Sequence, residues 1–315
     1  MSVLRVAAGV SLPGESELSV GLSVWLPATP ASIALVCLAG GNMNRRYFDL
    51  RPDDGDESYS FAVQMSARGF AVIAIDHLGL GDSSKPKDGY ALTPDVLTRA
   101  NQHATADVLG RLREGRFADG VAALPNLKSI GVGHSMGAMM TVLQQARAQQ
   151  HVAIALLGFS TRGLPDYMPA DVRALSQEQQ RARLVEFARQ MFVLPYPVIR
   201  SSGNGAEIYG SARAEAKGIA ALKAATDCLL PVTAFMSMLP GNVAPEAAEI
   251  DVPVFLGLGE RDMAGPPHAI PAAFLMSRDV TLHILPETGH SHFLFPTRTE
   301  LFDRLGVWAK SVLKN

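Results

Sequence analysis

A serine between two glycines is the residue of this 315-residue chain best placed to do chemistry. Ser135 lies in the segment Gly133-His134-Ser135-Met136-Gly137, which follows an apolar, β-branched run and precedes a helix-forming run. A serine hydroxyl attacks carbon only when its geometry is forced and a base takes its proton. The flanking glycines permit the sharp strand-to-helix turn that supplies this geometry. We therefore predict that Ser135 is a nucleophile.

A serine nucleophile needs an imidazole base, and the chain has eight histidines. His290 follows the last predicted strand, residues 280–285, so we expect it at the same sheet edge as the serine. His292 lies two residues further on and is the main alternative. His134 directly precedes the serine and cannot readily turn back onto it. The predicted base is therefore His290.

The imidazole in turn needs a carboxylate to hold it in the correct tautomer. Asp262 follows the predicted strand at residues 252–258, so it also lies on a carboxyl-end loop. Glu260 is the close alternative, whereas Asp251 precedes the same strand and belongs to the opposite end of the sheet. The chain order serine, acid, histidine accompanies a serine in such a turn. We predict Asp262 as the acid.

Attack on an ester produces an oxyanion, which backbone N–H donors stabilise. The residue after the nucleophile, Met136, supplies one predicted donor of this oxyanion hole. The second is expected from Ala39-Gly40-Gly41-Asn42, which follows the predicted strand at residues 33–38. Glycines let the backbone approach a substrate closely. Gly41 is favoured as the second donor, and Asn42 is the alternative.

The elements that carry these loops alternate along the chain. Short apolar runs typical of strands covered on both faces alternate with amphipathic helices, one of which opens at Thr93-Pro94 with the N-cap and first-turn residues that helices prefer. This alternation predicts an α/β protein with a doubly wound, mostly parallel sheet and flanking helices. Residues 3–10 and 18–26 alternate apolar and polar side chains, which predicts an antiparallel pair at a sheet edge. The predicted parallel strands are 33–38, 71–75, 127–132, 152–158, 252–258 and 280–285.

The alternation stops for roughly ninety residues, which carry no clear strand signal. Helices are predicted near residues 176–192, 211–225 and 229–238, and later helices at 271–276 and 297–312. Ligands bind at the carboxyl ends of strands in doubly wound sheets. We therefore expect a core domain made of residues 1–159 and 250–315, and a helical cap, or lid, made of residues 160–249.

Apolar side chains in the expected cap indicate a substrate pocket. Phe235, Met236 and Met238 lie close together in the sequence, and residues 191–194 add a second apolar cluster. Flexible methionine side chains suit an adaptable apolar pocket. The same residues could equally pack the cap onto the sheet.

Composition narrows the classes of partner. The formal net charge of −2 gives no basic field for nucleic acid or an anionic membrane. No run of about 18 apolar residues predicts a membrane-spanning helix, and no secretory signal is visible. Cys37 and Cys228 are expected to be buried thiols, so we predict a cytoplasmic protein without metal or other cofactor that acts on a small-molecule substrate. The sequence leaves open whether the chain forms a homodimer.

Three segments together carry a resemblance to a known family. The segment from Asp76 to Ser83 (DHLGLGDS) resembles the strand-4 loop of the α/β-hydrolase superfamily, the turn around Ser135 resembles its nucleophile elbow, and Gly289-His290 resembles its terminal histidine loop. The resemblance implies the α/β-hydrolase fold and assigns nucleophile, acid and base to Ser135, Asp262 and His290. Many members have His-Gly in the oxyanion loop where this chain has Ala39-Gly40.

The expected reaction follows from these residues. We predict a serine hydrolase that cleaves a carboxylic ester, thioester or lactone of a small, largely apolar substrate through an acyl-enzyme. Dehalogenases and epoxide hydrolases of the resembled superfamily use an aspartate nucleophile, so the serine argues against both. A diketone C–C bond hydrolase, an acyltransferase and a non-catalytic ligand receptor remain alternatives.

Overall fold

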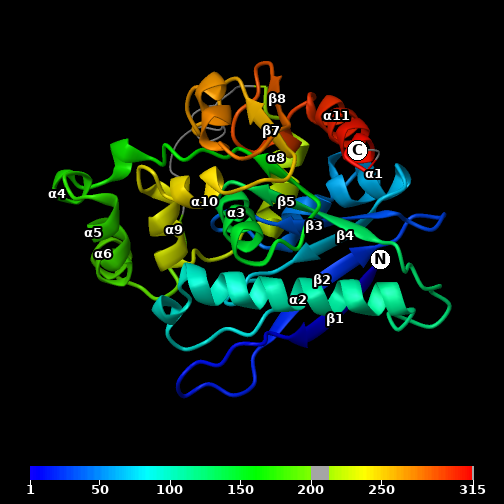
Figure 1. Cartoon of the computed structure of the whole chain (residues 1–315), viewed down its shortest axis with the longest axis horizontal. Helices are drawn as coiled ribbons and strands as arrows, with labels where there is room; N and C mark the ends of the chain where they lie inside the picture. Colours follow the sequence, from blue (N-terminus) through cyan, green and yellow to red (C-terminus); the bar gives the residue numbers. More distant parts are fainter. Residues whose placement is uncertain (200–212, 314–315) are drawn as a thin grey trace.

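An eight-stranded sheet is the centre of the molecule (Figure 1). The computed structural model describes residues 1–199 and 213–313. The strand order is β1-β2-β4-β3-β5-β6-β7-β8, with β1 and β2 antiparallel to their neighbours and the rest parallel. The predicted fold class is therefore confirmed. The strands are β1 (Ser2–Ala7), β2 (Ser19–Trp25), β3 (Ile33–Leu38), β4 (Ala71–Ile75), β5 (Lys128–His134), β6 (Ala153–Leu157), β7 (Val254–Gly259) and β8 (Val280–Leu285).

Helices cover both faces of this sheet (Figure 1). Side chains of β3 alternate between the two sides, because successive residues of a strand point to opposite faces. Val36 joins the core cluster that includes side chains of α2 (Pro94–Glu114) and α3 (Met136–Ala148). Leu35 joins the cluster that includes side chains of α1 (Phe61–Ala67) and α11 (Arg298–Ser311). Burial on both faces explains why these strands are apolar without interruption.

The helix predicted to open at Thr93-Pro94 begins as expected. The Thr93 side chain accepts a hydrogen bond from the Val96 N–H, and Pro94 occupies the first turn. Gly115 ends the helix in the left-handed conformation, with a φ of 68°. An N-cap of this kind stabilises a helix by about 1 kcal/mol. This helix packs on the same face of the sheet as α3.

Helices, rather than strands, fill the chain between β6 and β7. We call residues 160–249 the insertion; among its described residues the one extended pairing is an isolated bridge at Thr226. In Figure 1, α4, α5 and α6 lie at the left, and α9 lies between them and α3. The α-helices in the described part of the insertion are α4 (Ala170–Arg173), α5 (Gln177–Ala182), α6 (Leu184–Phe192), α8 (Ala216–Leu222), α9 (Pro231–Met238) and α10 (Ala244–Ala248).

Several predicted helices differ in their bounds. The helix predicted at 176–192 is divided at Arg183, whose φ and ψ of −112° and 18° are not helical. The helix predicted at 271–276 is a 3₁₀ helix at Pro267–Ala273, where the internal Pro271 has no N–H to donate. The first two residues of the helix predicted at 211–225 lie outside the described residues, and α8 begins at Ala216.

The buried thiols are as predicted: Cys37 and Cys228 are both free and buried. Within residues 1–199 and 213–313, no helix is both long and apolar enough to cross a membrane.

Candidate active site

Ser135 lies at the junction of β5 and α3 in a strained backbone conformation. Its φ and ψ are 54° and −121°, a region that costs a non-glycine residue about 1–3 kcal/mol. The turn is tight, because a Cβ on Gly133 would lie 2.4 Å from the Ala138 Cα, and one on Gly137 would lie 2.1 Å from the Leu38 carbonyl oxygen. The glycines are therefore required sterically, and the turn presents the Ser135 side chain at the carboxyl edge of the sheet.

His290 and Asp262 meet Ser135 at this edge. The His290 Nε2 lies 2.7 Å from the Ser135 Oγ, and the His290 Nδ1 lies 2.6 Å from the Asp262 Oδ1. Asp262 follows β7 and His290 follows β8, so neighbouring parallel strands deliver the two side chains. A carboxylate accepts only, so Nδ1–H donates to Asp262 and Nε2 is free to accept the serine proton. The structure thus brings together all three residues predicted as nucleophile, acid and base.

The electrostatics favour this proton arrangement. Burial by itself lowers the pKa of His290, but the charge of Asp262 and its hydrogen bond outweigh burial and raise the pKa overall. Burial by itself raises the pKa of Asp262, whose side chain has no exposed surface, yet His290 and then His292 hold that pKa well below its ordinary value. Asp262 is therefore an anion held against a basic imidazole.

Two further histidines surround this pair. The His292 Nε2 lies 3.0 Å from the Asp262 Oδ2, so the main alternative base instead contacts the acid. The His134 Nε2 lies 2.8 Å from the His290 carbonyl oxygen and donates to it. Burial, followed by the proximity of His290 and His292, holds the pKa of His134 well below its ordinary value. His134 is therefore a neutral support for the loop that carries His290.

The alternative acids lie elsewhere. The Glu260 Oε2 accepts a hydrogen bond from the Glu287 N–H at the surface, 2.8 Å away. Asp251 is exposed and precedes β7, at the opposite end of that strand from Asp262. Neither carboxylate contacts the imidazole of His290 among the described interactions.

The loop after β3 passes close to Ser135. A Cβ on Gly40 would lie 2.9 Å from the His134 Nδ1 and 3.1 Å from the Ser135 Cβ, and one on Gly41 would lie 4.0 Å from the Met136 Sδ. Met136 is the first residue of α3, and the first N–H groups of a helix have no partner inside it. The predicted donors Gly41 and Met136 are thus neighbours of the nucleophile, and their role as oxyanion donors stays a prediction.

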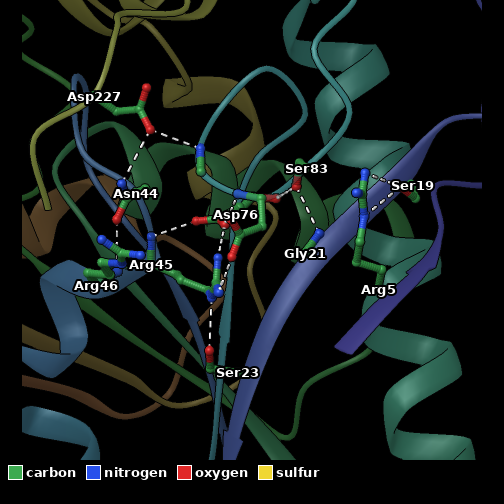
Figure 2. Close-up of polar contacts among 12 residues, drawn as sticks. Arg5, Ser19, Gly21, Ser23, Asn44, Arg45, Arg46, Asp76, Ser83 and Asp227 are labelled. Atoms are coloured by element: carbon green, nitrogen blue, oxygen red, sulfur yellow. Dashed lines mark hydrogen bonds and ion pairs between the residues drawn. The ribbon is translucent and has the colours of Figure 1, made fainter. Parts of the chain in front are cut away.

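A buried ion pair anchors the chain just beyond this loop (Figure 2). The Arg45 side chain is 7% exposed and that of Asp76 is 0% exposed. Asp76 accepts hydrogen bonds from the Arg45 guanidinium, from the Arg45 N–H at 2.7 Å and from the Asp82 N–H at 2.8 Å. A Cβ on Gly81 would lie 2.1 Å from the Asp76 Oδ2, so the strand-4 loop closes on this carboxylate. The segment from Asp76 to Ser83 therefore fixes the chain at Arg45, just after the loop of residues 39–42.

The insertion is also hydrogen-bonded to the loop that follows β3. Met43 and Thr226 form an antiparallel bridge. The flanking backbone hydrogen bonds run from Asn44 N to Ala225 O at 2.9 Å and from Asp227 N to Asn42 O at 2.8 Å. The Asp227 Oδ2 accepts from the Gly81 N–H at 2.8 Å and from the Asn44 Nδ2 at 3.2 Å (Figure 2). Asp227 thus joins the insertion to both loops.

A narrow cavity of about 70 Å³ opens at Ser135 and His290. The insertion contributes Ser160, Gly163, Leu164, Ser237 and Asn242 to its lining. The other lining residues are Met136, Met139, Gly158, Phe159, Met263 and Ala264. The cavity is small and has both polar and apolar walls.

The three predicted pocket residues do not line this cavity. Phe235 and Met238 pack in the apolar cluster between α9 and α6, where the Phe235 and Phe187 rings lie 5.8 Å apart. Met236 is buried in the main core. The apolar face of α9 is used to pack the insertion, which leaves Ser237 at the cavity.

Sequence reasoning missed Gly158, which follows β6 with a φ of 61°. A Cβ there would lie 2.9 Å from the His290 Cε1 and 3.2 Å from the Asp262 Oδ2. The signal was a glycine as the last residue of the strand predicted at 152–158. In the described part of the chain, no group of three or more His, Cys, Asp or Glu side chains is arranged to hold a metal ion.

A strained serine joined to an imidazole and a buried carboxylate is an arrangement that can activate a hydroxyl as a nucleophile. The chain belongs to the alpha/beta hydrolase family, whose model matches residues 35–300.

Solved structures share this fold over most or all of their length. The chain is similar to a lipase in an open form (16% identity, 100% of both chains, TM-score 0.66). It is similar to a monoacylglycerol lipase of Paleococcus ferrophilus (17% identity, 92% of this chain and 99% of the other, TM-score 0.63). It is also similar to a proline iminopeptidase of Mycobacterium smegmatis (19% identity, 99% and 98%, TM-score 0.59). No curated protein sequence matches the chain.

Proposed function

We propose that this chain is a serine hydrolase that cleaves a carboxylic ester, thioester or lactone of a small molecule through an acyl-enzyme. The observation that carries the proposal is the continuous row from the Ser135 Oγ through His290 to the Asp262 Oδ1, with contacts of 2.7 and 2.6 Å. The neighbours named as lipases support ester chemistry, while the peptidase neighbour shows that the fold alone does not select the bond.

In the acylation step, the proton of Ser135 passes to His290. The Ser135 oxygen attacks the carbonyl carbon as its proton moves to the His290 Nε2, and the carbonyl π electrons move onto oxygen. Asp262 stabilises the imidazolium that forms and does not itself take the proton. The N–H groups of Met136 and Gly41 are proposed to receive the oxyanion, each contributing about 3 kcal/mol to the barrier reduction. Collapse of this intermediate breaks the bond to the leaving group, which takes the proton from His290.

Deacylation repeats these steps with water. His290 takes a proton from water as its oxygen attacks the acyl carbon, and Ser135 leaves with that proton. The enzyme returns to its starting state, and the net reaction consumes one water per bond cleaved.

The insertion is proposed to act as a cap over this site, with residues 1–159 and 250–315 as the core domain. It lies between β6 and β7, whose carboxyl ends adjoin the site, and it supplies five lining residues, Ser237 and Asn242 among them. A cavity of about 70 Å³ suits a small acyl group. The polar walls favour an acyl group that is less uniformly apolar than the sequence predicts.

A fluorophosphonate probe and an ester panel test this function. We expect a stable adduct on the wild-type chain, none on Ser135→Ala, and unchanged labelling of Ser277→Ala, which alters a serine remote from the triad. Ser135→Ala should lower kcat on the order of 10⁵-fold or more, because the row acts as a unit. Acetyl and propionyl esters should be cleaved faster than octanoyl esters. A folded wild-type chain that forms no adduct would instead support a non-catalytic receptor.

A further inference from the structure

Asp262 receives an imidazole on each of its two oxygens. Oδ1 accepts from the His290 Nδ1 at 2.6 Å and from the Ala264 N–H at 2.9 Å, and Oδ2 lies 3.0 Å from the His292 Nε2. The side chains of Asp262 and His292 are both 0% exposed. Among the described residues, His292 is the one hydrogen-bond donor to Oδ2.

We propose that His292 is a positioning residue of the hydrolase site, which fixes the orientation of Asp262 and moderates its attraction for the proton of His290. The inference rests on the proposed function, in which Asp262 orients the base. His292 touches neither Ser135 nor the cavity, so its effect passes through the carboxylate.

The first part of the argument concerns orientation. A buried carboxylate oxygen without a donor is costly, so removal of His292 would leave Oδ2 either unsatisfied or turned toward another donor. The Ala264 N–H keeps Oδ1 beside the His290 Nδ1, so the change falls on Oδ2 and on how precisely the carboxylate aims the His290 ring at Ser135. The Nε2–H of His292 therefore selects one carboxylate orientation.

The second part concerns the tautomer of His292. Its Nδ1 is buried and has no hydrogen-bond partner among the described residues. A carboxylate oxygen can only accept, so the His292 Nε2 carries a proton and donates it to the Asp262 Oδ2. The bond that His292 makes to the carboxylate therefore comes from Nε2, and Nδ1 takes no part in it.

The third part concerns basicity. A hydrogen bond to the charged form of a carboxylate stabilises that form and weakens its attraction for other protons. Loss of the His292 bond should therefore strengthen the interaction of Asp262 with His290 and raise the pKa of His290 further. Three titratable groups surround His290: Asp262, His134 and His292. A fourth, Tyr47, lies beside His134 and interacts with Asp262.

Two substitutions separate the bond from the bulk of the ring. His292→Leu removes the donor, whereas His292→Gln can place its amide nitrogen near the position of the imidazole Nε2. For His292→Leu on p-nitrophenyl acetate we expect kcat to fall about tenfold to a hundredfold with little change in KM. The acid limb of kcat/KM should move about half a pH unit or more to higher pH. His292→Gln should restore most of both properties.

A matched control removes another buried imidazole. His151 contacts the Ser129 Oγ at 3.0 Å near the start of β5, away from Ser135, so His151→Leu should leave the acid limb in place whatever it does to thermal unfolding. Equal behaviour of His292→Leu and His292→Gln, or an unmoved acid limb in His292→Leu, would overturn the proposal.

A second readout does not depend on turnover. NMR titration of the ¹⁵N-labelled imidazole of His290 reports its pKa directly, and His292→Leu should raise that value. If Ser135 forms no adduct with the fluorophosphonate but the His290 titration moves as expected, the proposed function fails and the positioning role stands. If labelling succeeds and the titration does not move, the reverse holds.

Discussion

The two sides of Ser135 are held in place by different means. On one side, the base side, His290, Asp262 and His292 form a row of hydrogen bonds around one buried carboxylate. On the other side, which we call the oxyanion side, the uncharged backbone at Gly40 lies against the serine, and the Arg45–Asp76 ion pair follows this loop in the chain.

The placement of these charges explains the difference. The Arg45–Asp76 pair is buried under the oxyanion loop and contacts neither Ser135 nor the cavity. Arg45 also donates to the Ser23 Oγ at 2.8 Å and to the Asp82 Oδ2 at 2.5 Å (Figure 2). In the proposed mechanism the base side changes its protonation during the reaction, whereas the oxyanion side only keeps its shape. Substitutions on the base side should therefore move the pH dependence, and those on the oxyanion side should change rate or stability alone.

The largest effect is expected from Asp262→Ala on the base side. Without the carboxylate the imidazole loses both its tautomer and its counter-charge, so kcat should fall about 10⁴-fold. The acid limb of kcat/KM should also move to lower pH. Burial lowers the pKa of His290 and Asp262 raises it, so without Asp262 only the lowering remains. Steady-state kinetics from pH 4 to 9 measures both changes.

Glu260→Ala is the matched control for Asp262→Ala, since Glu260 is an exposed acid of the same loop. It should keep nearly full activity and the wild-type pH profile. If Glu260→Ala lost as much activity as Asp262→Ala, the assignment of the acid role to Asp262 would be wrong.

Asp76→Ala should give the largest effect on the oxyanion side, and the effect should appear in stability. It leaves the Arg45 guanidinium buried without its main partner, and removing one partner of a buried pair costs about 3–5 kcal/mol. Urea denaturation measures this loss. Asp303→Ala breaks an ion pair to Arg68 in which the Asp303 side chain is 60% exposed, and should cost about 1 kcal/mol or less. Similar losses in the two variants would contradict the structural role given to Asp76.

The sequence predicted the residues of the base side more completely than the contacts of the oxyanion side. The proximity of Ser135, Asp262 and His290 could be predicted, because each follows a strand and the carboxyl ends of parallel strands share one edge. Local glycines and chain order carried that information. On the oxyanion side the sequence indicated the glycine loop, but not its pairing with residues 225–227, which lie some 180 positions away and carry no motif.

Side-chain direction was harder to predict than proximity. His292 could be named as an alternative base, but its contact with Asp262 depends on how the loop turns after His290. Phe235 and Met238 face α6 and not the cavity, because the packing of α9 decides which residues it presents. Periodicity within one short helix does not determine which neighbour each face will meet.

The wild-type pH dependence is a smaller test of the same comparison. The base must be neutral to accept the serine proton, and Asp262 raises the pKa of His290 although burial opposes it. Activity should therefore fall as the pH drops through a value above the ordinary histidine pKa of about 6.5, by tenfold for each further pH unit. The free energy of unfolding, measured over the same pH range, should not follow this fall; if it does, the loss of activity reports unfolding.

Asp227→Ala should give the smallest effect and is the most direct test of the oxyanion side. The variant loses the acceptor of the Gly81 N–H and the Asn44 Nδ2, which loosens the loop that carries Gly41. A loop held less firmly should lower kcat about threefold to tenfold, since misplacement of one oxyanion donor costs part of its roughly 3 kcal/mol. The acid limb of kcat/KM should stay in place, because His290 and Asp262 keep all their contacts. Asp171→Ala, which alters an exposed acid of the insertion, should match the wild type in both respects. A shift of the acid limb in Asp227→Ala would show that the two sides of Ser135 are coupled, and the separation of proton transfer from loop support would then be wrong.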